Sequence, residues 1–309
     1  MPINIPQDLP AYQTLINELV FVMRADKALA QDIRPLKVAI VNLMPTKIET
    51  ETQILRLLSN SPLQIDITLI RTETYMSKNT SFEHLTTFYK TFNDVKDDYF
   101  DALFITGAPV EQLPFEEVAY WNELCAIMEW SKSRAWCSIH ICWGAQAGLY
   151  YHYGIQKYPL NKKMFGIYPQ TVHDPNHPLV RGFNETFDVP QSRHTEVRIE
   201  DIEKNPSLKL LASSPLSGAH LIIGKTIRQI FITGHAEYDR DTLKTEYFRD
   251  KDKGLEIELP HNYFPDNDDT KTPVNTWRGH ASLMYSNLLN FCVYQETPYD
   301  LTKLEKLLI

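Results

Sequence analysis

A cysteine stands where an apolar segment is expected to end and a helix to begin. Residues 135–141 are mostly apolar, Cys142 follows them, and small residues occupy positions 144, 145 and 147. A thiol at a strand-to-helix corner projects from the sheet edge, and the positive end of the helix dipole stabilises its thiolate. Small residues keep such a corner uncrowded, as they do around the serine elbow of hydrolases. Cys142 is therefore the predicted nucleophile.

A second segment offers a base for this thiol. Residues 227–232 alternate in polarity like a strand, and His235 and Glu237 follow soon after. If strand geometry persists through this end, residues two apart point to the same face. Glu237 could then hold the His235 ring while the other ring nitrogen faces the thiol. The pattern predicts a Cys142-His235-Glu237 triad for covalent catalysis.

Two other histidines, His140 and His194, are alternative bases. His140 lies two residues before the thiol, so the local corner fixes its position. A base that passes a proton to a substrate oxygen is better supplied by a separate segment. We therefore expect supporting hydrogen bonds from both. The other cysteines, at 125, 137 and 292, are interpreted as small buried apolar residues, and no Cys/His spacing indicates a metal site.

The composition narrows the class of protein. The chain has 309 residues, 43% of them hydrophobic, and a formal net charge of −8. This charge argues against nucleic-acid binding, which usually needs a basic face. Neither a signal peptide nor an apolar run long enough to span a bilayer is present, so we expect a cytoplasmic protein without membrane association. Four cysteines without a disulfide-like pattern fit that setting.

Strand and helix patterns alternate in the first half of the chain. Central strands are predicted at residues 36–43, 64–70, 100–107 and 135–141. The helix before the second of these strands has apolar residues that suit one buried face, at Ile48, Ile54, Leu55, Leu57 and Leu58. Alternation of this kind predicts an α/β fold, a doubly wound and mostly parallel sheet flanked by helices. Ligands gather at the carboxyl ends of such strands, so residues 106–109 and 142–144 are expected to share a pocket.

The second half of the chain has a different pattern. Beyond residue 155, short alternating runs, including residues 220–232, are interpreted as antiparallel strands that extend the same sheet. Helices are expected at 239–253 and 275–293, around a polar loop at 260–273. The simplest division is an N-terminal extension (1–35), one catalytic domain (36–300) and a C-terminal tail (301–309).

Several motifs, in order along the chain, resemble the homoserine O-acyltransferases of the class I glutamine amidotransferase-like superfamily. They are Asn42-Leu-Met-Pro-Thr-Lys, Thr106-Gly-Ala-Pro-Val, His140-Ile-Cys-Trp-Gly-Ala-Gln-Ala, Lys163-Met-Phe-Gly, Pro190-Gln-Ser-Arg-His-Thr-Glu and Gly234-His-Ala-Glu-Tyr. The resemblance implies that Cys142 takes an acyl group from an acyl-coenzyme A and passes it to the hydroxyl of L-homoserine. It further implies that His235 is the base, that Glu237 orients it, and that no bound cofactor is needed.

The resemblance also implies roles for residues outside the triad. Lys163, Ser192 and Arg249 match substrate-binding positions of the family, and a guanidinium suits the homoserine carboxylate. Backbone N–H groups near Trp143 would form part of an oxyanion hole. The family is usually dimeric, so a homodimer is expected.

The choice of acyl donor depends on Glu111. In the family, glycine after Gly-Ala-Pro-Val resembles users of succinyl-coenzyme A, and glutamate resembles users of acetyl-coenzyme A. A carboxylate there fills space and repels the free carboxylate of a succinyl group, which can outweigh the ~1.4 kcal/mol behind each tenfold preference. Acetyl-coenzyme A is therefore the expected donor. Homoserine O-succinyltransferase, a glutaminase and a catalytically silent thiol-sensing or binding module remain as alternatives.

Overall fold

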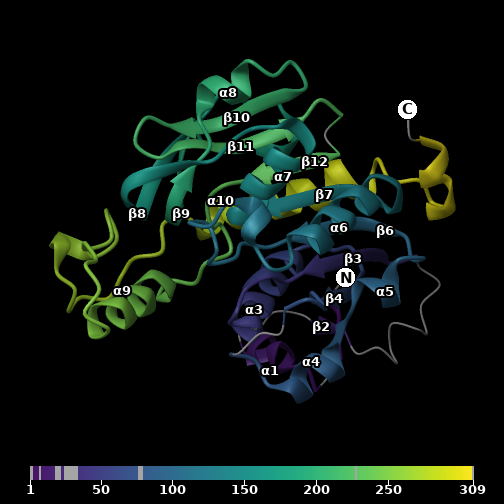
Figure 1. Ribbon diagram of the computed structural model, residues 1–309, viewed down its shortest axis with the longest axis horizontal. Helices are drawn as coiled ribbons and strands as arrows, with labels where there is room; N and C mark the ends of the chain where they lie inside the picture. The colour runs from purple at the N-terminus through teal and green to yellow at the C-terminus, as the bar shows by residue number, and fades with distance from the viewer. Residues whose placement is uncertain are drawn as a thin grey trace.

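A mixed sheet runs through the molecule, with helices on both of its faces (Figure 1). The computed structural model describes residues 3–6, 8–17, 22–23, 34–75, 79–226 and 228–307. Within these ranges the sheet has twelve strands in the order β2-β1-β4-β3-β6-β7-β12-β11-β10-β8-β9, and β5 pairs with β4 beside this path. The predicted α/β architecture is therefore confirmed.

One half of the sheet is parallel. Its strands are β1 (Ile3–Asn4), β2 (Val22–Met23), β3 (Leu36–Val41), β4 (Ile65–Ile70), β5 (Tyr89–Lys90), β6 (Phe100–Ile105), β7 (Ala135–Ile141) and β12 (Gln229–Ile232). Every residue of β6 is buried, as expected of a strand covered on both faces. The four strands predicted in the first half of the chain are confirmed, with ends that shift by at most two residues.

The other half is antiparallel and consists of β8 (Tyr158–Val172), β9 (Thr186–Glu196), β10 (Leu208–Ser214) and β11 (Gly218–Gly224). The prediction of antiparallel strands beyond residue 155 is confirmed for these four and holds for only one side of β12. That strand is antiparallel to β11 but parallel to β7, because it lies between them. The carboxyl end of β12 consequently lies at the same sheet edge as that of β7.

Helices cover both faces of the sheet. One face packs against α1 (Pro10–Asn17), α3 (Lys47–Leu58), α4 (Phe82–Phe88), α10 (Arg278–Asn287) and the following π-helix η4 (Leu288–Tyr294). The other packs against α5 (Phe92–Val95), η1 (Phe115–Glu117), α6 (Trp121–Arg134), α7 (Trp143–Tyr153) and α8 (Ile199–Glu203). The expectation that Ile48 is buried is wrong, because the first turn of α3 lies beside an open hollow and leaves Ile48 41% exposed.

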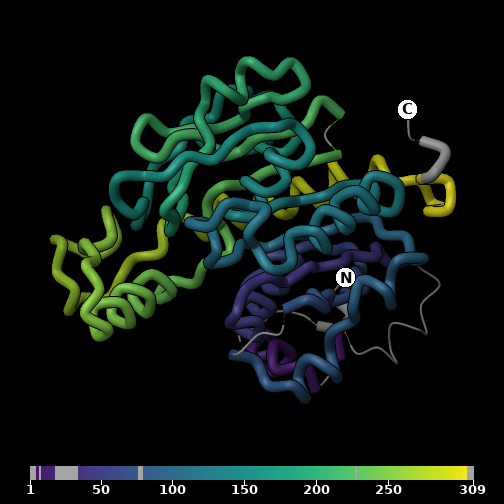
Figure 2. Tube along the Cα trace, in the orientation of Figure 1, coloured from purple at the N-terminus to yellow at the C-terminus, as the bar shows by residue number. Residues whose placement is uncertain are grey.

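Helix α9 (Thr242–Asp252) lies in a lobe at one side of the molecule, as the tube in Figure 2 shows. The lobe is attached through a small apolar cluster that joins β8 to α9 and to Trp277. The cluster also contains residues beside the short η3 helix (Pro265–Asn267). The predicted helix at 239–253 is thus confirmed, and the helix predicted at 275–293 is confirmed from residue 278 onward.

The two ends of the chain also join the main body. Strands β1 and β2 extend the parallel half of the sheet beyond β4. The C-terminal η5 helix (Leu301–Leu307) contacts α6 and buries Leu304, and η2 (Pro178–Val180) packs against α10. The division at residues 35 and 300 stays a prediction. In the described ranges, no helix combines the length and apolar character needed to cross a bilayer.

Candidate active site

Cys142 occupies a strained corner between β7 and α7. Its backbone has φ 52° and ψ −117°, a conformation that non-glycine residues rarely adopt. The corner is held because the Cys142 N–H donates to the carbonyl of Ile232 at 2.7 Å, at the end of β12. A Cβ at Gly144 would lie 2.6 Å from the carbonyl oxygen of Thr106, so only glycine fits there. The predicted elbow is therefore present, with Cys142 at its apex.

His235 and Glu237 form the predicted pair, but the backbone between them is not the extended strand that was expected. The distance between His235 Nδ1 and Glu237 Oε1 is 2.7 Å, and both side chains are buried. Strand geometry does not persist, however, because β12 ends at Ile232 and residues 236 and 237 lie in a turn. The His235 N–H donates to the carbonyl of Pro190 at 2.9 Å, which ties this turn to β9.

The imidazole of His235 faces both partners of the predicted triad. Burial by itself lowers its pKa, but Cys142 and Glu237, each through charge and a hydrogen bond, outweigh burial and raise the pKa well above the ordinary value. The ring also stacks on Tyr238, with 4.0 Å between ring centroids. A Cβ placed on Gly107 would lie 3.7 Å from both Cys142 Sγ and His235 Cε1. The loops at 106–109 and 142–144 thus meet at one site, as predicted.

The two other candidate bases lie elsewhere in the hydrogen-bond network. His140 is fully buried beneath α7, and its Nε2 lies 3.2 Å from the hydroxyl oxygen of Ser138. Burial, with a smaller contribution from His152, lowers the pKa of His140 to about 3, so its ring is neutral and weakly basic. The backbone N–H of His194 donates to the carboxylate of Glu111. Among the described residues, neither histidine is hydrogen-bonded to Cys142.

The three residues proposed to bind substrate converge on a fourth that sequence reasoning missed. Glu246 Oε1 lies 2.6 Å from Lys163 Nζ, 2.8 Å from Ser192 Oγ and 3.7 Å from an Arg249 Nη2. Glu246 could have been found from the sequence, because it lies three residues before Arg249 on α9 and therefore shares a helix face with it. Neighbouring Lys162, by contrast, pairs with exposed Glu258.

Glu111 lies at the rim of the same site. Its Oε2 is 3.4 Å from the hydroxyl of Thr195 on β9, and its backbone carbonyl accepts a hydrogen bond from Lys157 at 2.5 Å. Burial raises the pKa of Glu111, although the His194 N–H and the charges of His194, Arg193 and His235 act in the opposite direction. This carboxylate therefore lies within electrostatic range of both Arg193 and His235.

Arg193 is a second residue that sequence reasoning missed. It is 2% exposed, and its guanidinium donates to Gln191 Oε1 at 3.1 Å, to the carbonyl of Thr195 at 2.8 Å and to the carbonyl of Ser217. Burial lowers its pKa, and the largest opposing effect is the charge of Cys142. The alternation of β9 could have indicated Arg193, because Gln191, Arg193 and Thr195 all face inward while Ser192 faces Glu246.

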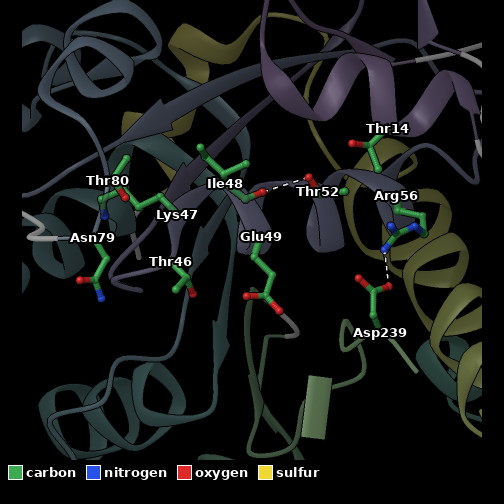
Figure 3. A pocket seen from close by; sticks show the side chains of 10 residues that line it. All are labelled: Thr14, Thr46, Lys47, Ile48, Glu49, Thr52, Arg56, Asn79, Thr80 and Asp239. Atoms are coloured by element: carbon green, nitrogen blue, oxygen red, sulfur yellow. Dashed lines mark hydrogen bonds and ion pairs between the residues drawn. The ribbon is translucent and has the colours of Figure 1, made fainter. Parts of the chain in front are cut away.

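An open hollow of about 510 Å³ lies at the start of α3 (Figure 3). Figure 3 shows the Glu49 side chain at its centre and the ion pair between Arg56 and Asp239 at one side. The charges of Glu246 and Arg249 both influence the pKa of Glu49, so these two residues lie within electrostatic range of the hollow. In the described ranges, no three His, Cys, Asp or Glu side chains gather as a metal site would need.

Comparison with known proteins identifies the family of this chain. Homoserine O-acetyltransferase of Acetivibrio thermocellus is 59% identical over 99% of this chain and 100% of its own length. Homoserine O-acetyltransferase of Clostridium acetobutylicum is 57% identical over 97% and 100%. A glutamine amidotransferase of Thermotoga maritima shares the fold, with a TM-score of 0.54, 13% identity and coverage of 84% of this chain and 99% of that one. The family described as homoserine O-succinyltransferase matches residues 2–299, and the chain belongs to it.

Proposed function

We propose that this protein transfers the acetyl group of acetyl-coenzyme A to the hydroxyl of L-homoserine, by way of an acetyl thioester on Cys142. The product would be O-acetyl-L-homoserine, a precursor in methionine biosynthesis in the cytoplasm, and the enzyme would act as a homodimer. The observation that carries the proposal is the meeting of Cys142, His235 and Glu237 at the carboxyl edge of β7 and β12. The names of the relatives, which match over nearly their full length, support the same reaction.

The first half-reaction begins from a thiolate beside a protonated imidazole, a state that the raised pKa of His235 favours. The Cys142 sulfur attacks the thioester carbonyl of acetyl-coenzyme A and forms a tetrahedral intermediate. As this intermediate collapses, the carbon–sulfur bond to coenzyme A breaks and the departing sulfur takes the proton from His235. The backbone N–H of Trp143, at the start of α7, meets no backbone carbonyl among the described residues, and we propose it as a donor to the oxyanion.

The second half-reaction uses the now neutral His235 as base. It accepts the proton of the homoserine hydroxyl as that oxygen attacks the acetyl-Cys142 carbonyl. Collapse of the second intermediate breaks the bond to Cys142 and restores the thiolate and the imidazolium. Glu237 holds the ring through Nδ1 in both steps and stabilises its charged form.

Glu111 supports acetyl over succinyl as the transferred group. Its carboxylate interacts electrostatically with Arg193 and His235, so an acyl chain on Cys142 would extend toward it. A methyl group fits beside a carboxylate, whereas the free carboxylate of a succinyl group is repelled by it. Homoserine O-succinyltransferase remains the second candidate, since the family description carries that name.

Two measurements on the purified full-length protein test the proposal. Incubation with acetyl-coenzyme A alone should release free coenzyme A and add one acetyl group to the peptide that contains Cys142. Initial rates with L-homoserine should then favour acetyl- over succinyl-coenzyme A. A preference for the succinyl donor would reassign the acyl group, and glutamine turnover without acyl transfer would indicate a glutaminase. An inert protein with a reactive Cys142 would be a thiol-sensing or binding module.

A further inference from the structure

Three open hollows on the surface join into one furrow. The hollow at the start of α3 shares Arg56 and Asp239 with a second hollow of about 460 Å³. The second hollow in turn shares Arg240 and Asp241 with a third, of about 680 Å³. The furrow therefore runs from the first turn of α3 to the first turns of α9.

Contacts between α3 and the residues around the start of α9 hold the furrow in shape. Arg56 Nη1 donates to Asp239 at 2.7 Å, an ion pair that Figure 3 shows at one side of the first hollow. Gln53 Nε2 donates to the hydroxyl of Thr242 at 3.0 Å. The furrow is therefore bounded by elements that are linked to each other through side chains.

The furrow passes close to the reacting groups. Asp239 lines two of its hollows and directly follows Tyr238, whose ring stacks on His235 with 4.0 Å between the centroids. Arg249, which the family resemblance assigns to homoserine, lines the hollow at the α9 end. A long molecule that lies in the furrow can therefore place its reactive end at the site where Cys142 and homoserine meet.

The α9 end of the furrow is basic. The third hollow is lined by three cationic side chains, Arg240, Lys244 and Arg249, and by one acidic side chain, Asp241. Arg278 lines the adjoining second hollow. Among the described residues, the side chains of Lys244 and Arg278 form no hydrogen bond or ion pair, and only their backbone N–H groups donate. Two positive charges thus face the furrow without a protein counter-ion.

Coenzyme A matches this furrow in length and charge. Its adenosine end carries a 3′-phosphate and a diphosphate, and a long uncharged pantetheine arm separates these groups from the thioester. Phosphate oxygens bind best to Lys and Arg side chains, and Phe248, one helical turn after Lys244, offers an apolar surface for the adenine ring. Building on the proposed function, we propose that Lys244 and Arg278 bind the phosphates of acetyl-coenzyme A, with the pantetheine arm lying along the furrow toward Cys142.

The α3 end of the furrow is the alternative place for the phosphates, because Lys47 lines the hollow there. The Lys47 ammonium, however, donates to the backbone carbonyls of Asn42 and Met44. Burial lowers the pKa of Lys47 to about 8, so a fraction of this side chain is uncharged at neutral pH. Glu49 adds a negative charge to the same hollow. The α9 end therefore attracts phosphate more strongly.

The test compares acetyl-coenzyme A with S-acetylpantetheine, which presents the same thioester arm without phosphates or adenosine. In the double variant Lys244→Gln/Arg278→Gln, the KM for acetyl-coenzyme A should rise at least about tenfold while kcat changes less than about twofold, because phosphate contacts are equal in the ground and transition states. The kcat/KM for S-acetylpantetheine should change less than about twofold. Neither side chain is buried and glutamine suits a helix, so folding should persist.

Two further variants serve as controls. Lys253→Gln removes an exposed cation at the end of α9, outside the three hollows, and should leave the values for both donors unchanged. Asp241→Asn removes the carboxylate that Arg240 Nη2 contacts at 2.8 Å. It frees a further guanidinium for phosphate and should lower the KM for acetyl-coenzyme A, the opposite direction to the double variant.

Binding of adenosine 3′,5′-bisphosphate, measured by calorimetry, gives a result that needs no turnover. This probe should bind to the wild type in competition with acetyl-coenzyme A, and at least about tenfold more weakly to the double variant. Bisphosphate binding without competition would overturn the assignment and indicate a separate nucleotide site. Equal losses for the two donors in the double variant, or no loss for either, would also overturn it. Failure of the wild type to form acetyl-Cys142 would instead reject the proposed function, and the bisphosphate measurement would still test the furrow.

Discussion

His235 Nδ1 lies 2.7 Å from Glu237 Oε1, and a turn after β12 brings the two side chains together. Both groups are nearly excluded from water, at 5% and 7% side-chain exposure, so the carboxylate acts on the ring without much screening. The same imidazole also forms a hydrogen bond with the side chain of Cys142. This short contact orients the ring and, together with Cys142, favours its charged form, as the proposed acid–base role requires.

Replacing Glu237 with glutamine should disable this ring while preserving the shape of the site. We expect kcat/KM for acetyl transfer to fall about 100- to 10,000-fold, because an amide can support the wrong tautomer and does not stabilise imidazolium. The check is steady-state kinetics with both substrates, beside the rate of Cys142 alkylation by iodoacetamide. Retention of more than a tenth of wild-type activity would remove Glu237 from the mechanism. Glu258→Gln, at an exposed position, serves as the neutral comparison.

Substitutions at Glu111 should separate charge from size in donor choice. Glu111→Gly removes both, and the ratio of kcat/KM for succinyl- over acetyl-coenzyme A should rise at least about tenfold, which corresponds to ~1.4 kcal/mol. Glu111→Gln keeps the bulk and removes only the charge. If repulsion dominates, the glutamine variant will gain succinyl activity nearly as well as the glycine variant. An unchanged ratio in both would show that the acyl chain does not reach Glu111.

The same residue should make donor choice depend on pH. Burial raises the pKa of Glu111, so this carboxyl group gains a proton at a higher pH than an ordinary glutamate does. Above the raised pKa the charged form repels a succinyl group, and below it the repulsion disappears. Discrimination against succinyl-coenzyme A should therefore weaken as pH falls in wild type. In Glu111→Gln, which cannot gain a proton at this position, the ratio of the two kcat/KM values should not change with pH through this effect.

The corner at Cys142 should store measurable strain. Glycine adopts φ 52° and ψ −117° more easily than any residue with a Cβ. Cys142→Gly should therefore be about 1 kcal/mol more stable to urea unfolding than Cys142→Ala, although both lack activity. As a control, Ala147→Gly within α7 should lose about 1 kcal/mol, since the backbone there is already helical. Equal stabilities for the two Cys142 variants would mean that the elbow is relaxed.

Substitution of Arg193 should lower the stability of the folded protein. Arg193→Met removes the donors to three buried acceptors, on Gln191, Thr195 and Ser217, and should lower the free energy of unfolding by about 3 kcal/mol. Arg193→Lys can satisfy part of this set and should lose less. The exposed Arg278→Met should stay within about 0.5 kcal/mol of wild type. Chemical denaturation measures all three, and a neutral result for Arg193→Met would contradict the importance of these hydrogen bonds.

Local patterns in the sequence were enough to predict most of the elements. Strands β3, β4, β6 and β7 are short apolar runs, and such runs are typical of strands that are buried on both faces of a parallel sheet. The corner at Cys142 was predictable because strand, small residues and helix follow one another directly in the chain. Ile48 was expected to be buried but is exposed, because helical spacing indicates which side of a helix is apolar and does not show how far along the helix that side is covered.

The sequence by itself determined the alternating architecture, the corner at Cys142 and the residues of the His235-Glu237 pair, because each depends on neighbours close along the chain. Only the tertiary structure decided the direction of β12, the turn that unites the pair, and the convergence of Lys163, Ser192 and Arg249 on Glu246. The physical reason is that each feature depends on residues dozens of positions apart: β12 pairs with β7, the turn at 235–237 is tied to Pro190, and Lys163 and Ser192 meet Glu246. Packing of the whole molecule decides which of these distant residues meet, and this cannot be read from a local hydrophobic period or a secondary-structure propensity.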